Sequence, residues 1–129
     1  MRILISGHNG KLGSNIKKAL SNKYTIVDHH RHECLTQKIK DTQPDMIIDV
    51  TSSISIHRHL PIYLLAQIPT IIGSSGLLPK QALGVVHKAQ FPLMIVPNFS
   101  PSFQKFAQKA IEIAQTHKVL SISETHHET

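Results

Sequence analysis

Residues 3–13 read Ile-Leu-Ile-Ser-Gly-His-Asn-Gly-Lys-Leu-Gly, and this stretch decides the fold. The apolar run Ile3–Ile5 predicts a buried strand, and three glycines spaced as G-x-x-G-x-x-G lead from it into Lys11–Ser21, an amphipathic segment that predicts a helix. Glycines at this spacing allow a tight turn and let a pyrophosphate approach backbone N–H groups at the positive end of the helix. The loop therefore predicts a dinucleotide site, although the spacing alone is also compatible with a glycine-rich turn in any α/β protein.

The rest of the chain alternates short apolar runs with longer amphipathic ones. Most apolar runs are continuous, as in the strands of a parallel sheet that helices cover on both faces. The sequence therefore predicts an α/β fold with a doubly wound parallel sheet. Pro61 falls within the third predicted helix, so that helix either begins near Leu60 or is kinked there. The predicted strands are Arg2–Ser6, Tyr24–Asp28, Met46–Val50, Thr70–Gly73, Leu93–Val96 and Val119–Glu124, and the predicted helices are Lys11–Ser21, Thr36–Thr42, Ile54–Gln67, Lys80–Ala89 and Ser102–Thr116.

Composition narrows the function classes. The chain has 129 residues, the size of one domain, and 14 Lys and Arg against 8 Asp and Glu give a net charge of +6. The basic residues are scattered and lack interleaved aromatics, so we expect attraction of anionic ligands and regard a basic, nucleic-acid-binding protein as the weaker alternative. No apolar run approaches the roughly 20 residues of a membrane helix. The absence of a secretory leader and the single cysteine, Cys34, favour a cytoplasmic protein.

Several polar residues cluster after the second predicted strand. Asp28 ends that strand, where an acidic side chain would meet the hydroxyls of an adenosine ribose. The following segment His29–Arg31 is interpreted as the rim of an adenosine pocket, in which Arg31 would accept a 2′-phosphate. The histidines, Glu33 and Cys34 here lack a zinc-like spacing, so no metal site is predicted. Residues 57–59, His-Arg-His, are interpreted as an exposed start of the third helix.

Four later segments carry a family resemblance. Asp49-Val50-Thr51, Gly73-Ser74-Ser75-Gly76, Pro97-Asn98-Phe99-Ser100 and Glu124-Thr125-His126-His127 follow the third to sixth predicted strands. In order and spacing they resemble the Asp-Phe-Thr, Gly-Thr-Thr-Gly, Pro-Asn-Phe-Ser and Glu-x-His-His segments of the 4-hydroxy-tetrahydrodipicolinate reductases. The whole chain is thus similar to the cofactor-binding half of that family, which implies a Rossmann-like sheet.

The resemblance implies the reduction of 4-hydroxy-tetrahydrodipicolinate, a dicarboxylate, to tetrahydrodipicolinate with NADH or NADPH in lysine and diaminopimelate synthesis. It implies that Thr51 and the Gly73–Gly76 loop border the nicotinamide and its carboxamide. His126 would donate the proton that follows the hydride, a task that suits imidazole, and His127 would contact a substrate carboxylate. The expected cofactor-binding residues are Gly7, His8, Asn9, Gly10, Lys11, Leu12, Gly13, Asp28, Thr51, Gly73, Ser74, Ser75, Pro97, Asn98 and Phe99.

The same residue types also have purely structural interpretations. Taken singly, Thr51 and the neighbouring serines are as typical of helix caps and turns as of ligand contacts. Likewise, a His-His-Glu-Thr terminus is also typical of a solvated chain end.

The chain also departs from the family pattern. The family motif continues to a lysine four residues beyond the first histidine and then to Pro-Ser-Gly-Thr, whereas this chain ends at Thr129. We therefore expect residues 1–118 to form a dinucleotide-binding domain and residues 119–129 to begin a truncated substrate and tetramerisation domain. The predicted function is that of the reductase, with this chain inactive alone and a homo-oligomer compatible with the family. The alternative is a non-catalytic NAD(P)-binding module or fragment.

Overall fold

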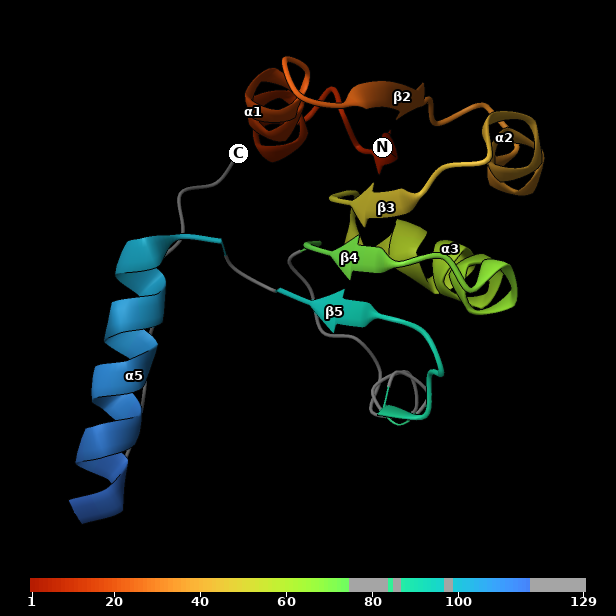
Figure 1. Cartoon of the computed structure of the whole chain (residues 1–129). Coiled ribbons are helices and arrows are strands. Elements are labelled where there is room, and N and C mark those ends of the chain that lie inside the picture. The colour runs from red at the N-terminus through yellow and green to blue at the C-terminus, as the bar shows by residue number, and fades with distance from the viewer. Residues whose placement is uncertain (75–83, 85–86, 97–98, 117–129) are drawn as a thin grey trace. The chain divides into compact units, whose positions relative to one another are not determined.

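The computed structural model describes residues 1–74, 84, 87–96 and 99–116 (Figure 1). The chain divides into two compact units, Met1–Asn98 and Phe99–Thr129. The predicted strand Val119–Glu124 and most of the predicted helix Lys80–Ala89 lie outside the described residues. The predicted domain boundary after residue 118 lies outside them too and stays a prediction.

The first unit contains a five-stranded sheet with the strand order β2-β1-β3-β4-β5. Every neighbouring pair is parallel, which confirms the predicted parallel sheet. The observed ends differ from the predicted ones by at most one residue. The strands are β1 (Arg2–Ser6), β2 (Thr25–His29), β3 (Met46–Asp49), β4 (Thr70–Ile72) and β5 (Leu93–Ile95).

Helices cover both faces of this sheet. α1 (Lys11–Leu20) packs Ile16 and Leu20 on one face, while α2 (Leu35–Thr42) and α3 (Ser53–Ala66) pack on the other. Figure 1 shows α1 on the opposite side of the strands from α2 and α3. Because both faces are covered, consecutive residues of β1 are buried, and this explains the continuous apolar run in the sequence.

α3 begins earlier than one of the two sequence alternatives allowed. The helix starts at Ser53 and runs through Pro61 to Ala66, so a start near Leu60 is wrong. Ser52 caps it by accepting a hydrogen bond from the N–H of Ser55 at 3.2 Å. A proline removes one backbone hydrogen bond, and here the cap and the buried side chains of α3 outweigh that loss.

The second unit contains α5 (Pro101–Thr116), which confirms the predicted helix Ser102–Thr116. None of its residues is buried, and its large apolar side chains Phe106, Ile111 and Ile113 are exposed. No helix in the described part of the chain has both the length and the apolar character needed to cross a bilayer.

Candidate nucleotide site

The carboxyl ends of the parallel strands all lie at one edge of the sheet. The direction in which successive strands are added to the sheet reverses at β1. From β1 the chain crosses to β2 on one side and then, through α2, to β3 on the other side of β1. The boundary between β1 and β3 is therefore the topological switch point, where open α/β sheets bind ligands in a crevice. Gly7 follows β1 and Thr51 lies two residues beyond β3, so both predicted loops flank this boundary.

The three glycines of the first loop serve different purposes. Gly7 has φ +87°, and a Cβ on it would lie 2.7 Å from the carbonyl oxygen of Val50. A Cβ on Gly13 would lie 2.1 Å from the carbonyl oxygen of Gly7. Among the described residues, a Cβ on Gly10 would instead meet only that Gly7 oxygen, at 3.4 Å. Chain packing thus requires the first and third glycines, whereas the second leaves space above the loop for a ligand to approach.

The amino end of α1 is open to an anion. Gly10 is its N-cap residue, and no side chain in the described part of the chain caps this end of the helix. The first turn contains no acidic residue either. Because first-turn N–H groups have no partner within a helix and lie at its positive end, this terminus favours a phosphate group.

A groove of about 420 Å³ adjoins the loop and follows α1. The buried His8 lines it, and its Nδ1 has no hydrogen-bond partner among the described residues. The His8 ring meets the His30 ring edge-on with centroids 4.6 Å apart, and His30 stacks on His32 at 5.8 Å. Of the two lysines in the lining, Lys17 is paired with Asp28, so Lys18 carries the positive charge that favours an anionic ligand. The lining residues are His8, Asn9, Ser14, Lys17, Lys18 and Ser21.

Asp28 lies beside α1. It pairs with Ile5 across the sheet, one residue before β2 ends. Its Oδ2 is 2.5 Å from the Nζ of Lys17, while its Oδ1 is buried without a hydrogen-bond partner in the described part of the chain. A buried acceptor without a donor is uncommon, and a ribose hydroxyl is the donor that the prediction for Asp28 requires.

Glu33 holds the turn after β2. Its Oε2 accepts a hydrogen bond from the backbone N–H of His30 at 2.7 Å, and its Oε1 accepts one from Lys38 Nζ at 2.8 Å. These bonds, the His30 N–H first, lower the pKa of the Glu33 carboxyl to about 2. The turn that carries His30 and His32 is thereby fixed next to the glycine loop.

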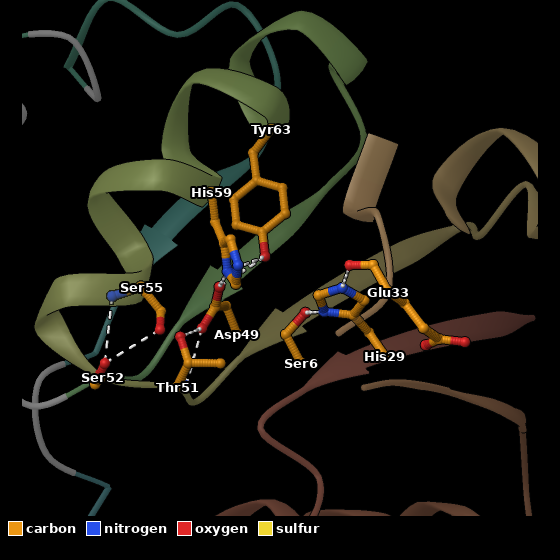
Figure 2. A network of polar contacts seen from close by, with 9 residues as sticks. All are labelled: Ser6, His29, Glu33, Asp49, Thr51, Ser52, Ser55, His59 and Tyr63. Atoms are coloured by element: carbon orange, nitrogen blue, oxygen red, sulfur yellow. Dashed lines mark hydrogen bonds and ion pairs between the residues drawn. The ribbon is translucent and has the colours of Figure 1, made fainter. Parts of the chain in front are cut away.

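Asp49, the last residue of β3, is fully buried and centres a polar network (Figure 2). Its Oδ1 accepts hydrogen bonds from the Thr51 N–H at 2.9 Å and the Thr51 hydroxyl at 2.5 Å. Its Oδ2 accepts from His59 Nδ1 at 2.7 Å and from the Tyr63 hydroxyl at 2.6 Å. His59 and Tyr63 lie one turn apart on α3, so both point at the same carboxylate.

Burial and hydrogen bonding act on the pKa values of Asp49 and Tyr63. Burial acts to raise the pKa of Asp49, but hydrogen bonds from His59, Thr51 and Tyr63 outweigh it and the pKa is lowered. Burial and the neighbouring Asp49 carboxylate raise the pKa of Tyr63 well above its ordinary value. Asp49 is therefore an ionised, fully hydrogen-bonded carboxylate, and Tyr63 remains a hydroxyl donor.

The buried side chain of His29 forms a second set of hydrogen bonds beside the Asp49 network (Figure 2). Its Nε2 donates to the backbone carbonyl of Glu33 at 3.2 Å, so in the neutral ring Nδ1 accepts from the Ser6 hydroxyl at 2.9 Å. Burial lowers the pKa of His29, which favours this neutral form. The His29 and His59 rings approach edge-on with centroids 5.7 Å apart.

The structure corrects two sequence interpretations. His59 was expected to lie on an exposed helix start together with His57, but its side chain is only 15% exposed and contacts Asp49. His29 was expected on the rim of the adenosine pocket, but it points into the protein. Strand alternation explains the second error, because Asp28 and His29 are neighbours on β2 and must face opposite sides of the sheet. Tyr63 was missed altogether, and its place one turn after His59 was the only available signal.

Not every predicted site residue is described. The glycine loop, Asp28, Thr51, Gly73 and Ser74 belong to the first unit, where Gly73 N–H donates to the Asp49 carbonyl at 2.7 Å. Phe99 is exposed at the start of the second unit. The other predicted residues lie outside the described residues, namely Ser75, Pro97, Asn98, His126 and His127. The described residues contain no group of three His, Cys, Asp or Glu able to hold a metal ion.

A doubly wound parallel sheet with a glycine loop at its switch point defines a Rossmann-like α/β protein. The family described as dihydrodipicolinate reductase, N-terminus, matches residues 1–99. The chain therefore belongs to the dihydrodipicolinate reductase family, and the resemblance seen in the sequence motifs is confirmed.

Curated relatives agree with this assignment, and a solved structure has the same fold. The 4-hydroxy-tetrahydrodipicolinate reductase of Coxiella burnetii is 27% identical over 134 residues, covering 98% of this chain and 56% of that protein. The protein of the same name from Legionella pneumophila is 26% identical over 133 residues, covering 98% of this chain and 55% of that protein. The chain thus spans about half the length of these curated relatives. A dipicolinate-bound dihydrodipicolinate reductase from Paenisporosarcina sp. TG-14 shares the fold, with a TM-score of 0.72 and 18% identity over 90% of this chain and 54% of that one.

Proposed function

We propose that this chain binds NADH or NADPH along the carboxyl edge of its sheet and forms the cofactor half of a 4-hydroxy-tetrahydrodipicolinate reductase. The glycine loop carries the proposal, because Gly10 leaves open space at the uncapped amino end of α1 while Gly7 and Gly13 are packed tightly. Membership in a reductase family supports the same conclusion.

The strand order suggests how the dinucleotide lies. The adenosine would sit at the end of β2, beside Asp28 and the groove lined by His8 and Lys17. The pyrophosphate would cross the loop at Gly10. The nicotinamide would then lie on the other side of the switch point, toward Thr51 after β3 and Gly73 after β4.

The residues of this chain would have separate tasks in the reaction. The 4-hydroxyl group of the substrate leaves as water, which gives an unsaturated cyclic imine dicarboxylate, and the dinucleotide, when bound, would supply a hydride to the conjugated carbon of this imine. His126 would then donate a proton to the resulting enamine-like carbon, and His127 would contact a carboxylate of the substrate. Both roles follow from the sequence motif Glu124–His127.

Calorimetric titration of the chain with NADH tests the binding step. We expect saturable binding of one nucleotide per chain, competed by ADP-ribose, because both ligands present the same pyrophosphate to α1. Absence of heat and of competition at millimolar nucleotide would rule out the proposed site.

The cofactor preference should depend on Asp28. We expect NADH to bind at least as well as NADPH but with a modest preference, because Lys17 offsets the charge of Asp28 and Arg31 attracts a 2′-phosphate. The variant Asp28→Asn should shift the NADPH-to-NADH affinity ratio toward NADPH by about tenfold, since it removes a repelling carboxylate. Side-by-side titrations at one salt concentration measure the ratio. A preference of about 100-fold for NADPH in the unchanged chain would contradict the assignment of Asp28 to the ribose.

A polypeptide of these 129 residues should bind the nucleotide but should not reduce the dicarboxylate substrate at an enzymatic rate. Hydride transfer requires the substrate to be held about 3–3.5 Å from the nicotinamide, and the family's Pro-Ser-Gly-Thr substrate segment is absent from these residues. A coupled assay with freshly generated substrate, followed by NADH absorbance, tests this. Turnover that disappears in His126→Ala would contradict the expectation and would support the role of His126 directly.

A further inference from the structure

The hydroxyl of Thr51 is committed as a donor inside the protein. It donates its only proton to Asp49 Oδ1 at 2.5 Å, and the backbone N–H of Thr51 donates to the same oxygen at 2.9 Å. A hydroxyl has one proton and two acceptor lone pairs. Toward any ligand, Thr51 Oγ1 can therefore only accept a hydrogen bond.

The carboxylate that receives this proton is itself held in place. Asp49 is fully buried, and its other oxygen accepts hydrogen bonds from His59 Nδ1 at 2.7 Å and from the Tyr63 hydroxyl at 2.6 Å. Rotation of the Asp49 carboxylate would break these two bonds as well as those to Thr51 (Figure 2). The orientation of the Thr51 hydroxyl thus depends on two α3 side chains, His59 and Tyr63, which donate to the opposite oxygen of Asp49.

We propose that His59 and Tyr63 are positioning residues. Through Asp49 they hold the Thr51 hydroxyl as an acceptor for the carboxamide N–H₂ of the nicotinamide, next to which the family resemblance places Thr51. The inference rests on the proposed function, because it uses the placement of the nicotinamide at the β3 end of the switch point. The carboxamide is the hydrogen-bond donor on the nicotinamide ring. An acceptor that cannot donate therefore favours the carboxamide over a substituent that has a carbonyl group but no N–H, such as an acetyl group.

Binding of three ligands distinguishes the contribution of the carboxamide from that of the rest of the dinucleotide. NADH carries it, reduced 3-acetylpyridine adenine dinucleotide replaces its N–H₂ by a methyl group, and ADP-ribose lacks the ring. In Thr51→Val we expect NADH to bind about tenfold more weakly, with the other two ligands changed by less than about twofold. His59→Leu should give the same selective loss, and Tyr63→Phe a smaller one of about threefold.

Two further variants test whether His59 acts by its hydrogen bond. An asparagine can place an N–H₂ donor near the position of His59 Nδ1, so His59→Asn should restore most of the NADH affinity lost in His59→Leu. His57→Leu is the matched control, because His57 lies exposed on the same helix. It should bind all three ligands like the unchanged chain. Thermal unfolding of every variant reports separately on stability.

The outcomes distinguish the two proposals. If the unchanged chain binds neither NADH nor ADP-ribose, the proposed function fails and the inference fails with it. If the unchanged chain binds both, but Thr51→Val and His59→Leu weaken all three ligands equally or none of them, the inference alone is overturned. Selective loss of NADH, with rescue by His59→Asn, supports it.

Discussion

Gly10→Val is expected to abolish NADH binding while leaving the fold intact. The backbone of Gly10 has φ −73°, which any residue adopts, and within the described part of the chain a Cβ there meets only the Gly7 carbonyl oxygen at 3.4 Å. The valine side chain would instead occupy the space through which a pyrophosphate reaches the N–H groups of α1. Losing two charge-assisted hydrogen bonds of about 1.5–3 kcal/mol each should weaken binding by more than about 100-fold. Titration with NADH, together with circular dichroism, measures both halves of this expectation.

Gly13→Ala is the matched contrast, because it should damage the fold first. Its new methyl group would lie 2.1 Å from the carbonyl oxygen of Gly7, a backbone atom that cannot move without opening the turn. We expect a loss of roughly 3 kcal/mol or more in unfolding free energy. If Gly10→Val kept full NADH affinity, or unfolded the protein as Gly13→Ala does, the loop would not be the nucleotide site described above.

Asp49→Asn should cost about 2–4 kcal/mol of unfolding free energy, measured by urea denaturation. Asparagine has the same size, but its N–H₂ group replaces an acceptor oxygen and must face either Thr51 or the donors from α3. A buried donor is then left without an acceptor. The control is Asp41→Asn, because Asp41 is exposed and accepts a hydrogen bond from Gln37 on α2 at 2.7 Å. A cost for Asp49→Asn no greater than that of the control would mean that the network does not stabilise the fold.

The same variant has a defined pH dependence. The pKa of Asp49 is lowered from its usual 3.8 in the folded chain, because the hydrogen bonds to His59, Thr51 and Tyr63 outweigh burial. A depressed carboxyl pKa contributes stability above the unfolded value, and this contribution is lost as the pH falls through the folded value. The stability gap between the unchanged chain and Asp49→Asn should therefore narrow once the pH falls below 3.8. A gap that widens in acid would contradict this sign.

The elements that flank the candidate nucleotide site followed from local signals in the chain. The apolar run of β1 and the glycine loop predicted the strand, the turn and the helix that follow one another there. Parallel strands place all their carboxyl ends at one edge, so Gly7 and Thr51 were predictable as neighbours once the strands were known. Pro61 also allowed a start of the third helix near Leu60, and this alternative is wrong because the cap at Ser52 and the buried side chains of α3 decide where that helix begins.

The sequence by itself determined the order along the chain of the strands and helices that the structure describes, the glycine loop and the family, because these depend on hydrophobic periodicity and motifs within a few residues of each other. Only the tertiary structure decided the partners of the buried polar groups. Asp49 and Tyr63 are 14 residues apart, and Ser6 and His29 are 23 apart, so no local pattern links them. They meet because α3 packs on β3 and because β2 pairs with β1, and burial then requires each polar atom to find a partner within reach.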